Sequence, residues 1–372
     1  MKLLHISDLH LGKRVFEMSM MEEQRAVLDQ VVAMAARADA TIIAGDVYDR
    51  QVPPAEAVAL FDAFLTRMSA QGSPVLLIPG NHDSAERIAF GSQLMDRSGV
   101  HVAPVYDGRT RKVVLHDALG DVNVYLLPFV KPAHVRAALE REDIEGYTQA
   151  IEAAIEAMHV DGAARNVLVA HQFVTGASRS ESEEVSVGGL DGVDAEVFSP
   201  FDYVALGHLH AAQSLMDGRV RYSGAPVCYS FSEAGREKCA LLVELGKKGV
   251  CSVTPLPFVP VHAMRKLRGR FEELMRPECA TQDYVQITLT DEEDVPDAVG
   301  KLTGNYPNFM QLLYDNARTR AGQAEFDARD AVTRTPLELF EALYCAQNGT
   351  QMTAPQRSLL TGMMETIWEE DA

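Results

Sequence analysis

Five apolar segments that end in histidine, aspartate or asparagine constrain the fold of this chain more than any other feature. They read as buried strands and alternate with helical patterns. The segments are KLLHIS (2–7), ATIIAGD (40–46), PVLLIPGNHD (74–83), NVLVAH (166–171) and YVALGH (203–208). Helices are expected at 20–38, 54–70, 85–97, 131–141 and 145–160. This alternation, followed by clustered strands such as VRYSGAP and CALLVEL, predicts an α/β sandwich of two mixed sheets with helices outside.

The polar residues of interest all follow these strands. They are Asp8, His10, Asp46, Asp49, Asn81, His82, His171, His208 and His210. Ligands of open α/β folds bind outside the carboxyl ends of the strands, so these groups are expected along one edge. A single histidine after a strand is ordinarily a surface or loop residue, and Gly-Asn is ordinary turn chemistry. Their occurrence behind five separate strands favours a site.

The residue types indicate the chemistry of that site. Imidazole, carboxylate and amide ligands without thiolate suit manganese, iron or zinc. Two ions about 3.5–4 Å apart need a shared ligand, and a carboxylate can bridge them. Such a pair neutralises the charge that develops during in-line displacement at phosphorus. The pattern therefore predicts hydrolysis of a phosphate ester.

The ordered motifs SDLHLG, GDVYDR, GNHDS, AHQF and GHLH resemble the calcineurin-like metallophosphoesterase superfamily. The resemblance implies two ligand sets, which share Asp46: Asp8, His10, Asp46 and His210 for one ion, and Asp46, Asn81, His171 and His208 for the other. It also implies that His82 contacts the scissile phosphate and assists the leaving oxygen. Asp49 would orient and charge His82. Arg50 is either a phosphate contact or a solvated loop residue.

Four longer blocks resemble the SbcD family of bacterial nuclease subunits. They are KLLHISDLHLGKR, GDVYDRQVPPAEAVALFDAFL, IPGNHDSAERIAFGSQLM and YSGAPVCYSFSEAGREKCALLVEL. The resemblance implies two divalent ions, with Mn²⁺ preferred over Mg²⁺, Fe²⁺ or Zn²⁺. It implies a homodimer in a 2:2 complex with the SMC-like ATPase SbcC. That complex would act as an exonuclease on duplex ends and an endonuclease on single strands and hairpins, in DNA repair, recombination and replication.

The chain is expected to contain four parts. Residues 1–258 form the nuclease domain, and the proline-rich PLPFVPVH (255–262) marks its boundary. Residues 259–318 suggest a small α+β module, and the resemblance implies that this module is a capping domain that selects DNA. Its basic residues Arg265, Lys266, Arg268 and Arg270 either contact DNA or belong to a solvated strand.

Residues 319–335 are polar and are expected to be a linker, and residues 336–372 are expected to be helical. The helical part has apolar residues at helical spacing. They are Leu337, Phe340, Leu343, Tyr344, Leu359, Leu360, Met363, Met364, Ile367 and Trp368. They either pack on the chain's own core or dock on the SbcC coiled coil, which the resemblance favours.

Composition limits the partners. The 372 residues include 34 basic and 53 acidic side chains, a net charge of −19. No part is therefore a basic nucleic-acid module, and DNA binding must come from local patches, metal ions or a partner. Nothing matches G-x-x-x-x-G-K-[ST], so no ATP site is expected here and ATP dependence would enter through SbcC.

The chain is expected to be cytoplasmic. Its five cysteines contain no C-x-x-C pair, which argues against a disulfide framework or a structural zinc site. His5, Ser7 and Asp8 interrupt the first apolar run, so no signal peptide is expected. No apolar run reaches the roughly 18 residues of a membrane helix.

Two other functions share this metal site. A phosphoesterase for nucleotides or other small phosphodiesters would have no use for the cap or the terminal helices. A non-catalytic scaffold usually lacks ligands or the catalytic histidine, whereas every such position is present here.

Overall fold

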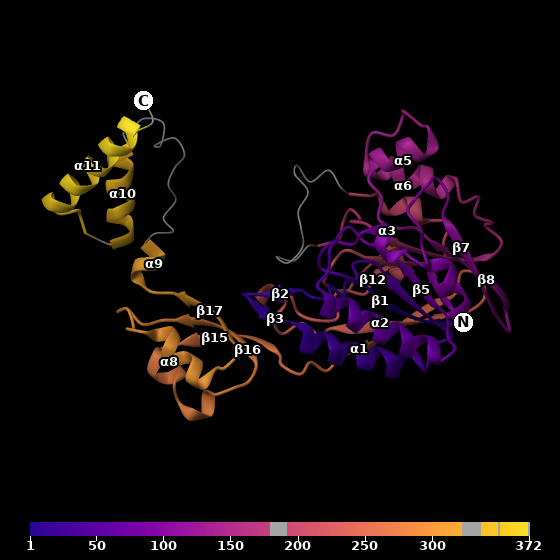
Figure 1. Cartoon of the computed structure of the whole chain (residues 1–372), viewed down its shortest axis with the longest axis horizontal. Helices are drawn as coiled ribbons and strands as arrows, with labels where there is room; N and C mark the ends of the chain where they lie inside the picture. The colour runs from indigo at the N-terminus through magenta and orange to yellow at the C-terminus, as the bar shows by residue number, and fades with distance from the viewer. Residues whose placement is uncertain (179–191, 322–335, 349, 371–372) are drawn as a thin grey trace. The chain divides into compact units, whose positions relative to one another are not determined.

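The chain divides into two compact units, Met1–Met264 and Arg265–Ala372 (Figure 1). The computed structural model describes residues 1–178, 192–321, 336–348 and 350–370.

The first unit contains two six-stranded sheets, which confirms the predicted α/β sandwich. In sheet order, the first comprises β14 (Cys251–Pro257), β13 (Cys239–Leu245), β1 (Lys2–Ile6), β4 (Ala40–Ala44), β5 (Val75–Ile78) and β6 (Val100–Val102). Strands β1, β4, β5 and β6 are parallel, whereas β13 and β14 are antiparallel to their neighbours. Part of the proline-rich boundary segment is therefore strand, and its Pro255 and Pro257 lie on the edge strand β14, where proline is tolerated.

The second sheet has a parallel centre and antiparallel edges. In sheet order it comprises β11 (Gln213–Leu215), β12 (Val220–Tyr222), β10 (Tyr203–Gly207), β9 (Arg165–His171), β8 (Gly120–Leu126) and β7 (Arg111–Asp117). Strands β8, β9, β10 and β12 are parallel. Because both sheets have parallel strands at their centres, the carboxyl ends of β1, β4, β5, β9 and β10 can carry loops to one shared edge.

The two sheets face each other across an apolar core. Strands β4 and β5 approach β8, β9 and β10 of the opposite sheet. Ile42 and Leu76 of the first sheet and Val124 and Val167 of the second are fully buried in this layer. Strands buried on both faces read as continuous apolar runs, which is why their sequences lack the alternation of a half-exposed strand.

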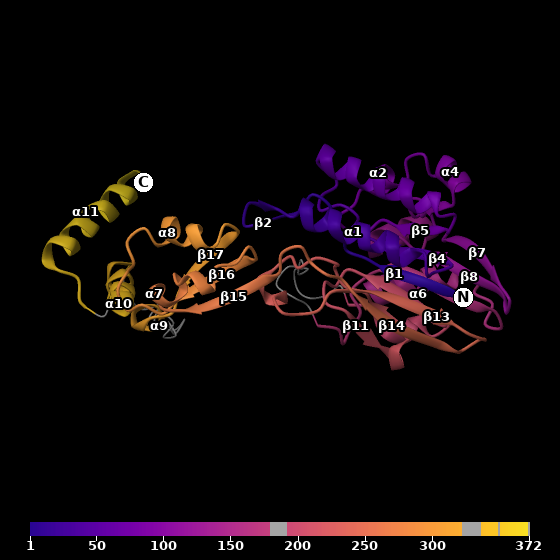
Figure 2. The same ribbon diagram turned by 90° about the horizontal axis from the view of Figure 1, so that it is seen from below.

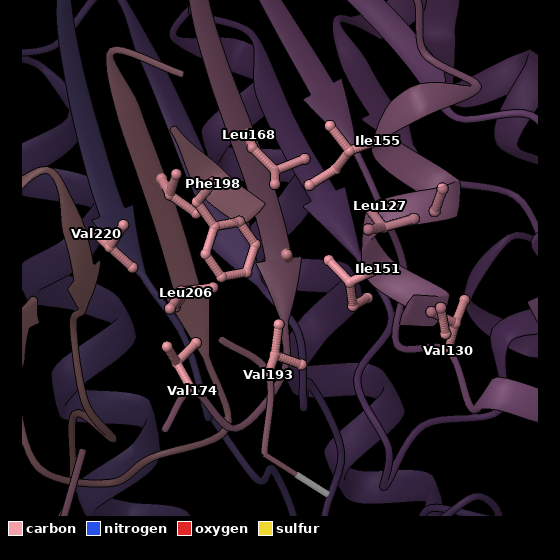
Figure 3. Close-up of a cluster of buried hydrophobic side chains, with 14 of the residues drawn as sticks. Leu127, Val130, Ile151, Ile155, Leu168, Val174, Val193, Phe198, Leu206 and Val220 are labelled. Atoms are coloured by element: carbon pink, nitrogen blue, oxygen red, sulfur yellow. The ribbon is translucent and has the colours of Figure 1, made fainter. Parts of the chain in front are cut away.

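Helices cover the outer faces of both sheets. Figure 2 shows α1 (Met21–Ala35) and α2 (Ala55–Ala70) over β1, β4 and β5. On the second sheet, α5 (Pro132–Leu139) and α6 (Tyr147–Glu156) pack together. Figure 3 shows Ile151 and Ile155 of α6 in one apolar cluster with Leu168 of β9, Phe198 and Leu206. The predicted helices at 20–38, 54–70, 131–141 and 145–160 are confirmed with shorter bounds.

The prediction of one helix over 85–97 is wrong. The segment forms α3 (Ala85–Ile88), α4 (Ser92–Met95) and the 3₁₀ turn η1 (Asp96–Ser98). Gly91 interrupts it with a φ of 71°, a left-handed conformation that glycine adopts without strain. The break leaves Phe90 85% and Leu94 70% exposed.

Short elements complete the first unit. They are the hairpin β2 (Arg14–Val15) and β3 (Met18–Ser19), and the 3₁₀ turns η2 (Ala195–Phe198), η3 (Met216–Gly218) and η4 (Phe231–Glu233).

The second unit contains a three-stranded sheet with two short helices. Its elements are β15 (Met264–Gly269), α7 (Phe271–Leu274), η5 (Pro277–Cys279), β16 (Tyr284–Leu289), α8 (Ala298–Asn305) and β17 (Phe309–Tyr314). Ile287, Leu302 and Tyr306 are fully buried in a separate apolar core. Strands β16 and β17 and helix α8 thus share one core.

After β17, the described residues form three helices: α9 (Ala317–Ala321), α10 (Pro336–Asn348) and α11 (Ala354–Glu370). Helix α9 includes the first three residues of the predicted linker, and residues 322–335 lie outside the described residues. Helices α10 and α11 contact each other through an ion pair of 2.6 Å between Glu341 and Arg357. No helix in the described part of the chain is long and apolar enough to cross a membrane.

A buried histidine gives the first prediction. His5 lies between the sheets, with Nδ1 2.9 Å from the Tyr203 hydroxyl and Nε2 3.2 Å from the Leu206 carbonyl oxygen. Burial lowers the pKa of His5 from 6.5 to about 3. Between these values the unfolded chain binds a proton that the folded chain excludes. We expect His5 to reduce the free energy of unfolding by about 1.4 kcal/mol for each pH unit below 6.5.

Urea unfolding of the native protein and of His5→Gln at pH 7.5, 6 and 5 measures this dependence. Because glutamine carries no titrating group, its stability should decline less steeply below pH 6.5. Equal slopes for the two proteins would contradict the assignment to His5.

Candidate metal centre

The loops that follow five strands meet at one edge of the sandwich. Hydrogen bonds between backbone groups join the first two loops: Asp8 N donates to Gly45 O at 3.0 Å, and His10 N donates to Asp46 O at 3.0 Å. The Asp8 carboxylate also accepts the backbone N–H of His208, 2.9 Å away. Strand ends that are far apart in the sequence are therefore tied to one another.

One group of candidate ligands comprises Asp8, His10 and His210. Each offers a ligand atom within 4.8 Å of the others, and all three residues are buried. The Nε2 atoms of His10 and His210 lie 3.0 Å apart. Two imidazole nitrogens that face each other beside a carboxylate in a buried position form a donor set that a divalent cation fits.

A second group is centred on Asn81. Its Oδ1 lies 3.0 Å from His171 Nε2 and 3.1 Å from His208 Nδ1. Asp46 lies between the two groups, because its Oδ2 is 3.2 Å from His171 Nε2 and 3.7 Å from His10 Nε2. The two groups contain the same residues as the two ligand sets that the sequence resemblance implied, and Asp46 lies where a ligand shared by both sets is expected.

The electrostatics of the buried carboxylates favour a cation. Burial and the charge of Asp46 raise the pKa of Asp8 to about 6, although His171 and His210 act in the opposite direction. Burial lowers the pKa of His171, but the Asp46 carboxylate outweighs it and raises this pKa to about 9. A protonated His171 would compensate part of this negative charge, whereas burial lowers the pKa of His10 well below its usual value. Divalent ions would supply the positive charge instead.

Four of the candidate ligands have a left-handed backbone conformation. Asp8, His10, Asp46 and His208 have φ values of 54°, 44°, 51° and 106°. Non-glycine residues in this region are uncommon and gather at functional sites, where the surrounding structure holds them.

Two glycines permit the close approach of the loops. A Cβ atom at Gly80 would lie 2.1 Å from Asp46 Oδ1, and one at Gly207 would lie 1.9 Å from the Ala44 carbonyl oxygen. The glycines of GNHD and GHLH are therefore required by packing, in addition to their part in the turns.

Residues behind the candidate ligands hold them in place. His171 Nδ1 lies 2.8 Å from the Ala44 carbonyl oxygen. In the neutral tautomer that donates there, Nε2 keeps a lone pair, which a cation held beside Asn81 and Asp46 would accept. The loop that carries His10 is held by Gln24 of α1, which donates from Nε2 to the His10 carbonyl oxygen at 2.7 Å. Tyr229 donates to the Leu9 carbonyl oxygen.

Asp83 organises the loops after β4 and β5, and the sequence analysis did not select it. Its carboxylate accepts the backbone N–H groups of Val47, Tyr48 and Gly80 at 2.9–3.0 Å. Burial and the neighbouring Asp46 raise the pKa of Asp83 to about 6. Its position at the end of GNHD was the signal that could have identified it.

Glu233 was also missed. It is fully buried, with Oε1 3.8 Å from His210 Nδ1 and Oε2 2.5 Å from Lys238 Nζ. Burial alone would raise the pKa of Glu233, but His210 and Lys238 outweigh it and hold the pKa at about 2. Residues 222–245 include none of the predicted ligands. They nevertheless supply Glu233, the carboxylate next to the predicted ligand His210.

His82 and Asp49 are neighbours, but not in the expected manner. His82 Nδ1 lies 3.1 Å from the backbone carbonyl oxygen of Asp49, and the backbone N–H of His82 donates to Asp46 Oδ1 at 2.9 Å. The Asp49 carboxylate instead accepts a hydrogen bond from Lys13 at 2.7 Å. The carboxylate of Asp49 thus does not orient His82 directly, because the ammonium of Lys13 holds it elsewhere. Arg50 is 80% exposed.

The basic cluster of the second unit is partly neutralised. Arg265 and Arg268 form ion pairs of 2.5 Å with Asp283 and Asp315. Lys266 and Arg270 are exposed on the same segment. Because two of the four charges are compensated locally, the cluster is less positive than its sequence suggests.

These features define a metal-dependent phosphoesterase, and comparison with known proteins agrees. The model of the calcineurin-like phosphoesterase family matches residues 1–212, and this chain belongs to that family. The model described as the Type 5 capsule protein repressor C-terminal domain matches residues 260–348. The family implies a divalent-metal site, and the clustered carboxylates and imidazoles have the composition for one.

Relatives confirm the resemblance to SbcD proteins. The chain is 29% identical to the D subunit of the nuclease SbcCD from Staphylococcus epidermidis, over 84% of this chain and 85% of the relative. It is 28% identical to the protein of the same name from Staphylococcus saprophyticus, over 100% of this chain and 99% of the relative. The crystal structure of TT1561 from Thermus thermophilus covers 68% of this chain and 98% of its own, with 14% identity and a TM-score of 0.37.

Asp83→Ala should destabilise the first unit even when a chelator is present. The substitution leaves three backbone N–H groups without their acceptor, two of them buried and one partly buried, so the free energy of unfolding should fall by about 3 kcal/mol or more. Urea unfolding in EDTA measures this change without a contribution from bound metal. Asp83→Asn keeps one acceptor oxygen and should lose less. Equal stability of native protein and Asp83→Ala would contradict this role.

Glu233→Gln should weaken metal binding. The carboxylate behind His210 would be neutral, and outer partners of metal-ligating histidines typically affect affinity by about 10–100-fold. Calorimetric titration with Mn²⁺ measures the dissociation constants of native protein and variant. Glu237→Gln, a change at an exposed neighbour, serves as the matched control. Similar affinities for Glu233→Gln and Glu237→Gln would contradict the expectation.

Proposed function

We propose that this chain is the nuclease subunit of an SbcCD-type complex and hydrolyses phosphodiester bonds of DNA. The observation that carries the proposal is the position of Asp46, whose carboxylate lies within 3.7 Å of candidate ligands of both groups. The two relatives named as subunits of the nuclease SbcCD support the choice of DNA, because one of them matches this chain over its whole length.

The chain would hold two divalent ions, Mn²⁺ in preference to Mg²⁺, Fe²⁺ or Zn²⁺. One ion would be held by Asp8, His10 and His210. The other would be held by Asn81, His171 and His208, and Asp46 would contribute to both. When bound, the ions would supply positive charge to the phosphoryl group during hydrolysis. The chain's own contribution is to orient these ligands through strained loops and the groups behind them, so that little reorganisation is needed when the substrate arrives.

His82 would handle the proton of the leaving oxygen. When its Nδ1–H donates to the Asp49 carbonyl, Nε2 is the atom that can exchange a proton with substrate. Asp49 would contribute through this backbone group and through the Lys13 ammonium that its carboxylate holds nearby.

The second unit would serve DNA selection and partner binding. We propose that residues 1–258 are the nuclease domain and residues 259–318 a capping domain that contacts DNA. Lys266 and Arg270 are the members of its basic cluster for which the structure gives no ion pair with a described residue. Residues 319–335 would link this domain to residues 336–372.

The terminal helices would dock on the coiled coil of an SbcC-like ATPase. Phe340 is 41%, Leu343 40% and Met363 56% exposed, and Leu337, Leu360 and Met364 are partly covered. Exposed apolar residues on adjacent helices suit a protein interface. The side chains of Ile367 and Trp368 lie outside the described part of the structure.

Cleavage would be exonucleolytic on duplex ends and endonucleolytic on single strands and hairpins. ATP would act through the partner, in a 2:2 complex that processes DNA ends for repair, recombination and replication in the cytoplasm. The alternative, hydrolysis of small phosphodiesters or nucleotides alone, is favoured by the fact that the metal centre itself does not require the second unit.

His82→Ala should lower hydrolysis of both DNA and bis(p-nitrophenyl) phosphate by about 10²–10⁴-fold, the usual contribution of a general acid or base. Cleavage of a labelled duplex and a hairpin in Mn²⁺ measures the first activity. Each protein is assayed with and without an SbcC-type partner and ATP. The native chain should cut DNA, and the partner with ATP should enlarge or redirect the cutting.

His159→Ala is the control, since it removes an exposed histidine from the turn that follows α6. Hydrolysis of the small diester through His82 without any DNA cleavage, even in the presence of partner and ATP, would overturn the DNA assignment and favour the alternative.

A further inference from the structure

A groove of about 750 Å³ opens beside the candidate metal centre. Asn81, the centre of one ligand group, belongs to its lining, and so does Phe129. Phe129 follows β8, and its ring lies edge-on to the His171 ring with centroids 6.3 Å apart. A substrate bound at the metal centre would therefore continue into this groove. The volume exceeds what one phosphate needs and is in the range of ligand-sized pockets.

The aromatic part of the groove comes from two loops. Phe129 and Tyr106 are both half-buried and line it. The backbone N–H of Phe129 donates to the Pro79 carbonyl oxygen at 3.1 Å, which fixes this loop to the loop that carries Asn81. Aromatic side chains held on such loops give surfaces on which bases of single strands stack, largely without regard to sequence.

The groove also contains an available cation. Lys131 lines it and is exposed, and none of the residues that the structure describes forms an ion pair with it. It directly precedes α5, so the partial positive charge of that helix end adds to its own.

Three carboxylates also line the groove. Asp83 is turned to backbone amides, Glu86 accepts from Ser84 Oγ at 2.9 Å, and Asp107 accepts from Arg109 N at 3.1 Å. These donors are neutral, so the carboxylates keep their charge. Lys131 remains the cation of this groove that is available to an anionic substrate.

We propose that this groove binds the nucleotide next to the scissile phosphodiester of a single DNA strand, with Lys131 at its phosphate and Tyr106 and Phe129 at its base. The inference rests on the proposed function and names a part of its substrate site. It gives a chain with a net charge of −19 a local cation and an aromatic surface for a polyanion in place of a basic face.

The test measures binding without turnover. Anisotropy of a labelled 12-nucleotide thymidine strand is recorded in Mn²⁺ at several salt concentrations, with His82→Ala as the background. Adding Lys131→Ala should weaken binding about fivefold and reduce the slope of log affinity against log salt by about 0.7, the value for one phosphate contact to a single strand. Adding Tyr106→Leu should weaken binding about fivefold or more with an unchanged slope, since stacking involves no counterion.

Lys112→Ala, which removes an exposed lysine on β7, is the matched control and should change neither value. Thermal unfolding verifies that each variant is folded. An unchanged salt slope in Lys131→Ala overturns the phosphate contact, and unchanged affinity in Tyr106→Leu overturns the base contact.

Failure of the proposed function would give a different result from failure of the groove proposal. It would appear as absent DNA cleavage by the native chain with its partner, in an assay that does not involve these variants. The binding measurement therefore tests whether the groove binds a nucleotide, independently of whether DNA cleavage is found.

Discussion

The position of the Asp46 carboxylate is the constraint on which the site depends. Oδ2 lies near His10 and His171 from two different sheets, while Oδ1 accepts the backbone N–H of His82. A carboxylate can hold this place only because Gly80 has no side chain and because the backbone at Asp46 adopts a left-handed φ of 51°. One residue thus joins both groups of candidate ligands to the histidine proposed for proton transfer.

The sandwich explains how such a strained arrangement persists. The loops emerge from parallel strands that are buried on both faces, so their starting points are held by the apolar core between the sheets. Asp83 then accepts three backbone N–H groups from the loops after β4 and β5. The free-energy cost of strain in a few loop residues is small compared with the free energy gained by burying a core of this size. The core therefore sets the geometry of the loops.

The first turn of α1 connects the metal centre with the end of the first unit. Gln24 holds the loop of His10, and its neighbour Glu23 accepts the backbone N–H groups of Val261 and His262 at 2.9 Å. Two adjacent side chains thus fix a ligand loop and the segment that leads to the second unit. A polar contact of this kind is invisible in a sequence, because 238 residues separate Glu23 from Val261.

Local sequence patterns determined the strands of the first unit and which residues meet at their ends. Apolar runs defined the parallel strands, and the ends of those runs identified Asp8, Asp46, Asn81, His171 and His208 as neighbours, since carboxyl ends of parallel strands share an edge. Local patterns failed at 85–97, where Gly91 outweighed the helical spacing of the apolar residues.

The tertiary structure decided which groups stand behind the ligands. Glu233 reaches His210 across 23 residues of chain, and Lys13 rather than His82 takes the Asp49 carboxylate. The strands also place Phe129 and Lys131 beside Asn81. The physical reason is that hydrogen bonds and ion pairs act over about 3–4 Å in space, whereas sequence patterns report only the burial and backbone conformation of each segment.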